Sequence, residues 1–274
     1  MKNAFQKVIQ DFGDEWDKYD YSDNNKENHY LFKKYFDIYP FKKFKLKNYR
    51  CLDVGCGSGR WAKILSNNVK HLTLLDPSLK AINVAKKNLK KKKNVTFINK
   101  SVGDMKFEKK FDFIYSLGVL HHLPNINEAL KIIATNLKKN RPFLVYLYYN
   151  LENKPLYYKA IWKFSDILRK IISRLPFKIK FTLSILIAFL IYYPFVIVAK
   201  ILKKIGLDPE IIPLGQYHDK SFYVMKTDAL DRFGTRYEKR YSKKQIKKLL
   251  ENNGFNNVKF SKKEPYWHAI AIKK

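Results

Sequence analysis

Residues 51 to 62, CLDVGCGSGRWA, place three glycines at alternate positions shortly after an acidic residue. An apolar run that is typical of a buried strand leads to Asp53, and a helical pattern begins after Gly59. A glycine turn between a strand and a helix leaves bare backbone for a ligand at the carboxyl edge of an open α/β sheet. The loop therefore predicts an α/β fold with its binding site at this edge.

The segments around and after the loop alternate between strand and helix patterns. The strand runs are almost wholly apolar, which is typical of a parallel sheet that is covered on both faces. Strands are predicted at 50–55, 71–76, 95–100, 111–117 and 143–149, with helices at 59–68, 78–91 and 126–139.

The last part of the chain has a different pattern. A helix is predicted over 242–254, with Ser242 as its N-cap and Gly254 as its stop. Two short strands follow at 257–260 and 266–273, and because only a few residues join them they must pair antiparallel. The predicted fold class is α/β: a Rossmann-like doubly wound sheet with a terminal antiparallel strand pair and a helical cap insertion.

The predicted domain organisation has four parts. An aromatic-rich, helical N-terminal flank covers 1–49, and the Rossmann-like core covers 50–150. Residues 151–216 fit no strand-helix-strand unit and are predicted to form the hydrophobic helical cap insertion. Residues 217–274 are predicted to complete the domain that the core begins.

The charges around the loop indicate which ligand it binds. A nicotinamide-binding loop reads G-x-G-x-x-G, and counted from Gly55 its third glycine would fall on Arg60. The carboxylate of Asp53, two residues before Gly55, would repel a pyrophosphate and favour a cation. S-adenosylmethionine carries an ammonium and a sulfonium and has no phosphate, so it matches these charges.

Residues 50–150 resemble the class I S-adenosylmethionine-dependent methyltransferases, most closely the small-molecule, methyltransferase type 11-like group with the loop D-x-G-C-G-x-G. Four motifs match in order: the loop, an acid that ends the second strand, SVGDMKF at 101–107 and SLGVLHHLP at 116–124. The resemblance implies that Asp76 binds the ribose hydroxyls and Asp104 the adenine amino group. The implied cofactor-binding residues are Asp53, Gly55, Cys56, Gly57, Gly59, Asp76, Pro77, Val102, Asp104, Met105, Ser116, Leu117 and His121.

One turn departs from the pattern of these methyltransferases. The turn before the fifth strand usually carries two glycines, whereas this chain reads KKNRPF, with Asn140-Arg141-Pro142 in their place. Asparagine tolerates a positive φ and proline fixes its own φ, so a turn is still predicted here.

Missing motifs narrow the choice of acceptor. Methyltransferases of base amino groups carry a [DNS]-P-P-[YFW] segment after the fourth strand, where this chain reads SLGVLHH. Cys51 and Cys56 lie in or before the loop, so neither is placed as a cytosine-C5 nucleophile. The sequence also lacks the glutamate pair of protein arginine methylation and the acidic cluster of the metal-binding catechol type. No metal site is predicted, and a small-molecule, sugar-linked or lipid-like acceptor is left.

Candidate residues for the acceptor lie after the fourth strand and near the return of the insertion. His121 is the candidate catalytic base because the ordinary pKa of histidine lies near working pH, although a purely structural role fits it equally. The basic segment 231–242 could face an anionic group or form a solvated loop. The candidate substrate-binding residues are Tyr148, Tyr149, Tyr217, His218, Arg236, Tyr237 and Arg240.

The net charge of +31 raises the alternative of a tRNA-modifying or other nucleic-acid-binding protein. The basic residues, however, divide into 47 Lys and 8 Arg, whereas base and phosphate recognition usually recruits arginine for its planar fork. Nucleic acid is therefore the less favoured partner. A steep salt dependence of RNA binding would support it.

The cysteines and the N-terminus predict a cytoplasmic location. Cys51 and Cys56 form neither CxxC nor CxxH spacing, which favours a reducing compartment. Asp11, Asp14 and Glu15 stand where a signal peptide would need its apolar core. A peripheral position at the inner face of the membrane is compatible with this location.

The insertion contains 19 uncharged residues at 181–199, just enough to cross a bilayer. A single crossing is excluded because both ends of the insertion must return to one sheet, and Pro194 is expected to break the run. A basic amphipathic helix precedes it, with apolar positions from Phe164 to Leu175. Residues 160–204 therefore form either a cap that keeps water from the acceptor pocket or an element in an anionic membrane interface, where a lipid or quinone acceptor would be methylated.

Overall fold

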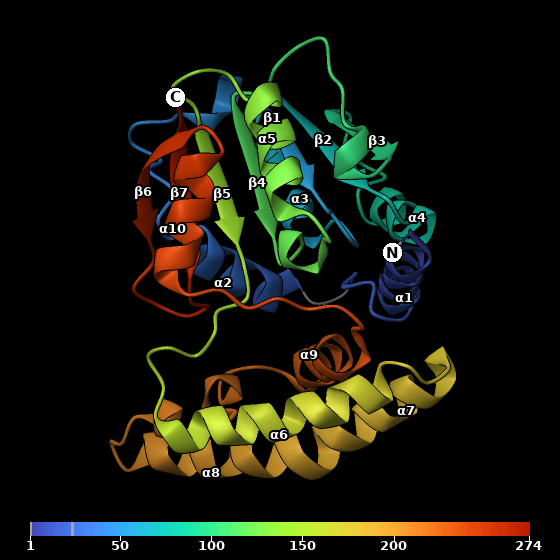
Figure 1. Ribbon diagram of the computed structural model, residues 1–274, viewed down its shortest axis with the longest axis vertical. Helices are drawn as coiled ribbons and strands as arrows, with labels where there is room; N and C mark the ends of the chain where they lie inside the picture. The colour runs from blue at the N-terminus through green and yellow to red at the C-terminus, as the bar shows by residue number, and fades with distance from the viewer. Residues whose placement is uncertain (1, 23–24) are drawn as a thin grey trace. The chain divides into compact units, whose positions relative to one another are not determined.

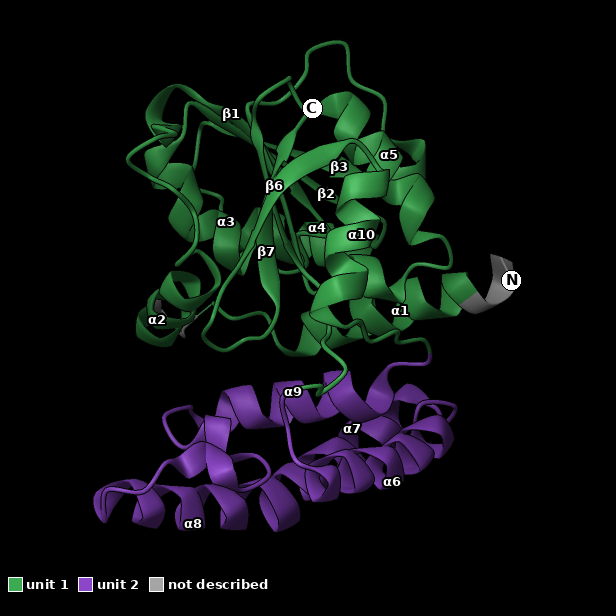
Figure 2. Cartoon of the chain, turned by 60° about the vertical axis from the view of Figure 1, so that its left-hand side comes forward, with its two compact units in different colours: residues 1–152, 237–274 green, residues 153–236 purple. Residues whose placement is uncertain are grey.

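The computed structural model describes residues 2–22 and 25–274. The chain divides into two compact units, which Figure 2 shows in different colours. The first unit consists of residues 1–152 and 237–274, and the second unit consists of residues 153–236. The second unit is thus inserted into the chain of the first.

A seven-stranded sheet runs through the first unit in the order β3-β2-β1-β4-β5-β7-β6 (Figure 1). Neighbouring strands among β1 to β5 are parallel, whereas β7 pairs antiparallel with both β5 and β6. This order confirms the predicted Rossmann-like sheet with a terminal antiparallel pair. The strands are β1 (Arg50–Val54), β2 (His71–Asp76), β3 (Val95–Asn99), β4 (Phe113–Leu117), β5 (Pro142–Tyr146), β6 (Phe255–Phe260) and β7 (His268–Lys273).

Helices cover both faces of this sheet, which explains why its central strands are apolar along their whole length. Figures 1 and 2 show α2 and α3 on one face and α5 and α10 on the other. Ile246 and Leu250 of α10 join the same buried cluster as Ile133 of α5 and Phe143 of β5. The helices of the first unit are α1 (Lys2–Lys18), α2 (Asn25–Tyr35), α3 (Arg60–Leu65), α4 (Leu79–Asn88), α5 (Ile126–Asn136) and α10 (Lys243–Asn252).

Local sequence signals place two of the boundaries in this unit. Ser242 caps α10 by accepting a hydrogen bond from the Gln245 backbone at 3.1 Å, and the Gln245 side chain accepts one from the Ser242 backbone. The turn before β5 forms without glycine because Asn140 adopts a φ of 59°. Both features agree with the sequence-based predictions.

The second unit contains four helices: α6 (Leu156–Ile172), α7 (Phe177–Ile187), α8 (Tyr193–Lys204) and α9 (Phe222–Gly234). Helix α9 packs against α6 and α7, and its Met225, Ala229 and Phe233 share a buried cluster with Ala188 and Val196. The unit therefore runs past residue 216, where the insertion was expected to end. The helical insertion itself is confirmed, and its role as a cap stays a prediction.

Pro194 does not break the apolar run, contrary to the prediction. Residues Phe177–Lys204 form one continuous helix of 28 residues, which by length and composition could cross a membrane. A π-helical turn at Ala188–Tyr192 joins α7 to α8, and Pro194 lies in the first turn of α8. The wider π turn accommodates the missing N–H and the ring of proline, so the helix continues.

Candidate functional site

The glycine loop connects β1 to α3 at the carboxyl edge of the sheet. Gly55, Gly57 and Gly59 have φ angles of 77°, 52° and 74°, which L side chains rarely adopt. The backbone N–H of Gly55 donates to the Leu75 carbonyl of β2 at 2.7 Å. The loop is thereby fixed across the ends of two neighbouring strands.

Each of these glycines also lies against a neighbour that leaves no room for a side chain. A Cβ at Gly55 would lie 2.4 Å from Val119, and one at Gly59 would lie 2.6 Å from Leu89. A Cβ at Gly57 would lie 2.7 Å from the Trp16 ring of α1. The alternate glycines are therefore required by both backbone conformation and packing.

We expect Gly55→Ala to lower the free energy of unfolding by about 2–4 kcal/mol, because it combines a strained φ with overpacking against Val119. Gly118→Ala is the matched control: Gly118 has a φ of 79°, but a Cβ at this position would have no heavy atom within 4 Å. The control should lose only about 1–2 kcal/mol from the strained φ. Urea unfolding of both variants tests this, and equal losses would contradict the packing argument.

Asp76 ends β2 and presents its carboxyl group to the glycine loop. Its two oxygens accept hydrogen bonds from the backbone N–H groups of Gly57 at 3.0 Å and Ser78 at 2.9 Å. Burial raises the pKa of Asp76 to about 6, although these two hydrogen bonds oppose the rise. The carboxyl group is therefore held in one orientation beside the loop and is mostly ionised at neutral pH.

Asp53 lies on the neighbouring strand β1 and is almost completely buried. Its Oδ2 accepts a hydrogen bond from the Tyr115 hydroxyl of β4 at 2.7 Å. Burial raises the pKa of Asp53 to about 8, and the nearby charge of Asp76 adds to the rise. A cationic ligand group at this site would offset that cost, because an opposite charge favours the ionised carboxylate.

The two carboxyl groups and the bare loop fit an organic cation that carries a nucleoside. Asp53 and Asp76 lie at the loop, and the Arg60 charge at the start of α3 partly offsets the rise in the pKa of Asp53. Among the described residues, no group of three or more His, Cys, Asp or Glu could hold a metal ion. The glycine loop and the two carboxyl groups describe the same ligand chemistry that the sequence indicates.

The structure spreads the other predicted cofactor-binding residues over the same edge of the sheet. Val102 and Met105 flank a short 3-10 turn and lie buried in the sheet's core cluster, while Asp104 on that turn is exposed. The Ser116 hydroxyl donates to the Val54 carbonyl at 3.0 Å and so joins β4 to β1. The remaining members of this set are Cys56, which is buried with a free thiol, half-buried Pro77, and Leu117 at the end of β4.

His121 lies completely buried in a 3-10 turn after β4. Neither of its ring nitrogens has a hydrogen-bond partner among the residues that the structure describes. Its ring stacks on Tyr148 with the centroids 3.9 Å apart, and the His122 ring lies at 4.0 Å. Burial, His122 and Arg240 hold the pKa of His121 well below its usual range, so the ring is neutral.

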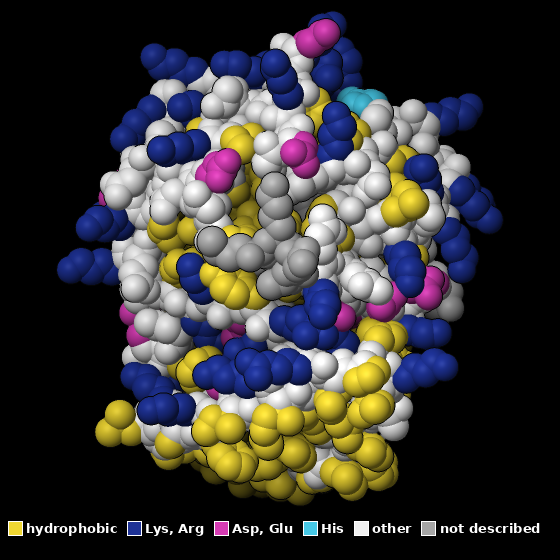
Figure 3. Space-filling view, turned by 45° about the vertical axis from the view of Figure 1, so that its right-hand side comes forward, with side chains coloured by type: hydrophobic (Ala, Val, Ile, Leu, Met, Phe, Trp, Pro, Cys, Tyr) yellow, Lys and Arg dark blue, Asp and Glu magenta, His cyan; other side chains and the backbone are white. Residues whose placement is uncertain are grey.

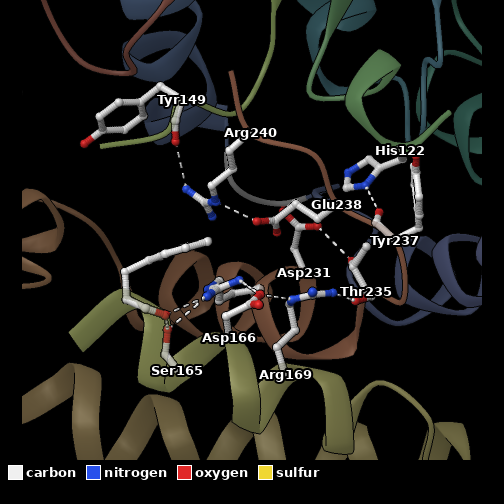
Figure 4. A network of polar contacts seen from close by, with 12 residues as sticks. His122, Tyr149, Ser165, Asp166, Arg169, Asp231, Thr235, Tyr237, Glu238 and Arg240 are labelled. Carbon is white, nitrogen blue, oxygen red and sulfur yellow. Dashed lines mark hydrogen bonds and ion pairs between the residues drawn. The ribbon is translucent and has the colours of Figure 1, made fainter. Parts of the chain in front are cut away.

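Arg240 brings several predicted acceptor residues together in the first unit (Figure 4). Its Nη1 donates to the Tyr149 carbonyl at 3.2 Å, and its Nε pairs with Glu238 at 2.6 Å. The guanidinium lies 5.3 Å from the centre of the Tyr148 ring. Tyr237 joins the group through its carbonyl, which lies 2.8 Å from Nδ1 of His122.

The other predicted acceptor residues belong to the second unit. Tyr217 is buried against the ring of Tyr192. In His218, Nε2 lies 2.9 Å from the Lys203 ammonium group and Nδ1 lies 2.9 Å from the Gly215 carbonyl. The Arg236 carbonyl accepts a hydrogen bond from Arg169 at 3.4 Å. Their contacts within this unit are packing contacts, and a role toward an acceptor stays a prediction for all three.

Two aromatic residues of the site were missed by the sequence analysis. Tyr115 holds Asp53, and Trp16 of α1 covers Gly57. The sequence predicts that Tyr115 lies on a strand, and in the structure that strand, β4, pairs with β1. No sequence signal, however, indicates that the Tyr115 hydroxyl bonds to Asp53. The aromatic residues near the N-terminus were expected to pack on the core. The sequence did not indicate that one of them, Trp16, would lie over the glycine loop.

The sheet order, the three-glycine loop and the two strand-end carboxyl groups together define a class I S-adenosylmethionine-dependent methyltransferase. The chain contains a domain of this class: residues 27–162 match the family model described as methyltransferase domain.

Three similar proteins share little of their sequence with this chain, or match only part of it. A segment of 96 residues is 34% identical to a ubiquinone biosynthesis O-methyltransferase of Pelagibacter ubique, and the match spans 35% of this chain and 40% of that protein. A second match is the structure of a protein from Bacillus halodurans C-125 that is described as a candidate methyltransferase. It is 15% identical to this chain with a TM-score of 0.51, and the match covers 83% of this chain and 69% of the Bacillus chain. The magnesium protoporphyrin IX methyltransferase of Synechocystis is 15% identical to this chain with a TM-score of 0.49. The match covers 92% of this chain and 84% of the Synechocystis chain. At 15% identity the Bacillus halodurans structure shows the fold alone.

Proposed function

We propose that the protein transfers the methyl group of S-adenosylmethionine to a small-molecule, sugar-linked or lipid-like acceptor. The observation that carries this proposal is the bare glycine loop between two buried carboxyl groups, Asp53 and Asp76. A cytoplasmic location belongs to the same proposal, and the two free, buried cysteines are compatible with it.

Each part of the site has a task toward the methyl donor. The loop would receive its amino-acid part, Asp76 would accept from the ribose hydroxyls, and Asp104 would accept from the adenine amino group. Val102 and Met105 would form apolar walls for the adenine. When bound, the donor supplies a methyl group on a positively charged sulfur, which a nucleophile displaces in line.

His121 would accept a proton from the acceptor if that acceptor is a hydroxyl or an ammonium. Its ring is neutral, and both ring nitrogens lack a partner among the described residues, so one nitrogen can accept a proton when an acceptor reaches this buried ring. Arg240 and Tyr148 hold their positions around it and would contact an acceptor that carries an anionic or aromatic group.

We expect His121→Gln to lower the rate of methyl transfer at saturating S-adenosylmethionine about a hundredfold or more, beyond any change in the affinity for S-adenosylhomocysteine. His122→Gln is the matched control, since the His122 ring is engaged with the Tyr237 carbonyl, and it should retain most of the rate. Single-turnover transfer and calorimetry of both variants check this. Full activity of His121→Gln would assign His121 a structural role only.

The first test of the proposed function is transfer of a labelled methyl group from S-adenosylmethionine into fractionated cell extract, followed by mass spectrometry of the labelled species. One labelled small molecule or lipid is the expected result. Label that appears only in RNA would instead support the nucleic-acid alternative. A chain that neither binds S-adenosylmethionine in calorimetry nor transfers label contradicts the proposal.

A membrane lipid or quinone is the second candidate acceptor. The second unit exposes a large apolar surface, and the partial match to a ubiquinone biosynthesis O-methyltransferase favours the same acceptor class. Label in the lipid-soluble fraction of the extract, and none in the aqueous fraction, would select this candidate.

A further inference from the structure

The large apolar side chains that are exposed are concentrated in the second unit. Among the residues whose side chains the structure describes, 24 large hydrophobic residues are exposed, and 21 of them lie in the second unit. Leu156, Phe164 and Leu190 are 82%, 64% and 65% exposed. Only 22% of the most apolar stretch of the long helix Phe177–Lys204 is buried, which differs from the core helix of a soluble protein.

Two charged side chains of the same helices, Arg169 and Lys180, are buried instead. Arg169 of α6 is buried, pairs with Asp166 at 2.7 Å and donates to the Thr235 carbonyl at 2.8 Å (Figure 4). Lys180 of α7 is 1% exposed and donates to the Gly234 carbonyl at 3.3 Å. The unit thus buries two charged side chains beside its apolar cluster while many of its large apolar side chains are exposed, which is unusual for a protein in water.

The charge of this segment suits an anionic surface. Residues 153–207 contain eleven Lys and Arg but a single acidic residue, Asp166, which is paired. Figure 3 shows a continuous surface of hydrophobic side chains at the foot of the view, with Lys and Arg side chains along its border. The exposed basic residues on and beside α6, α7 and α8 are Lys163, Lys170, Arg174, Lys178, Lys200, Lys203 and Lys204.

The connection to the sheet excludes a single crossing of a bilayer. The second unit follows β5 and precedes β7, and these two strands pair antiparallel in one sheet. Both ends of the unit must therefore lie on one side of the membrane. A second crossing by α6 is not available, because its 17 residues include Lys163, Asp166, Arg169 and Lys170.

We propose that the outer face of α6, α7 and α8 docks in the plane of an anionic lipid bilayer. In this position the exposed apolar side chains enter the acyl boundary, while the bordering lysines and arginines contact the lipid phosphates. The inference goes beyond the proposed methyl transfer, since membrane docking does not depend on which acceptor is methylated.

The first unit is a poor alternative partner for this face. Its exposed large hydrophobic residues, among those described, are Tyr30, Phe41 and Leu79 alone, and they are far apart in the chain. Such a surface cannot bury the many apolar side chains of α6, α7 and α8. A bilayer can bury all of them and also neutralise the basic border.

Co-sedimentation of the full chain with vesicles tests the proposal. We expect binding to phosphatidylcholine vesicles that contain phosphatidylglycerol, and at least about tenfold weaker binding to phosphatidylcholine alone. The double variant Phe164→Glu/Ile171→Glu, which changes residues that are 64% and 60% exposed on α6, should weaken binding at least about tenfold. Phe41→Glu is the matched control at a site 50% exposed in the first unit, and it should bind as the original chain does.

Three results would overturn this inference: no binding of the original chain to either vesicle, equal binding of the double variant, or a lipid-free dimer that the double variant dissociates. The last result would assign the face to a second copy of the chain. Affinity for S-adenosylhomocysteine is measured on every variant. The proposed site for that ligand lies in the first unit. If the original chain does not bind S-adenosylhomocysteine, this result contradicts the proposed function and leaves the docking result unaffected.

Discussion

The double variant Asp53→Ala/Asp76→Ala is expected to lose all calorimetrically detectable binding of S-adenosylmethionine. Asp76 is held by two backbone N–H groups at one end of the loop, and Asp53 is buried at the other. Hydrogen bonds to charged groups contribute on the order of 1.5–3 kcal/mol each. Loss of both carboxylates should therefore reduce affinity by at least about a hundredfold.

Asp112→Ala is the control for this experiment because it removes a buried carboxylate from the other end of the same sheet. Asp112 precedes β4, accepts from the Arg50 backbone at 3.0 Å and pairs with Lys138 at 2.8 Å. This variant should be less stable but should bind the methyl donor as the original chain does. Retained affinity in the double variant would remove the basis for the assigned donor site.

The class of the sheet, with its terminal antiparallel pair, and the positions of the glycine loop and of Asp76 could be predicted from the sequence because they depend on short-range patterns. Apolar strand runs with helical segments between them permit few topologies once crossovers are right-handed. The glycine loop requires a fixed backbone shape. Asp76 is the last residue of the next apolar strand run, and this position can be seen in the sequence itself. Asn140 could be placed in the turn before β5 for the same reason.

The features that could not be predicted depend on contacts between distant parts of the chain. The bond between Tyr115 and Asp53 joins residues 62 positions apart, and Trp16 reaches Gly57 from a helix that precedes the fold. The amphipathic pattern of α6 was compatible with a cap or with a membrane interface, and it did not indicate that many of its apolar side chains would be exposed while Arg169 is buried. Hydrophobic periodicity identifies two faces of a helix but not which of them faces the protein.

The stability of the protein should depend on pH through the same aspartates. Asp53 has a pKa of about 8 and Asp76 of about 6 in the folded chain, compared with the ordinary value of 3.8. Between about pH 4 and pH 8 the folded state therefore holds protons that the unfolded chain has released. Stability that is present at low pH is lost as the pH rises through this window.

We expect Asp53→Asn to raise the melting temperature by about 4–8 °C at pH 8, because the amide resembles the neutral carboxyl group and needs no ionisation on burial. The gain should shrink steadily as the pH falls and vanish only below the ordinary pKa of 3.8, where the carboxyl group of the original chain is protonated in both states. The same variant should bind S-adenosylmethionine more weakly, since the carboxylate that destabilises the folded chain is the group that would pair with the cation. Thermal unfolding across this pH range, together with calorimetry, tests both statements. A gain that is independent of pH would show that desolvation of this carboxyl group is not its cause.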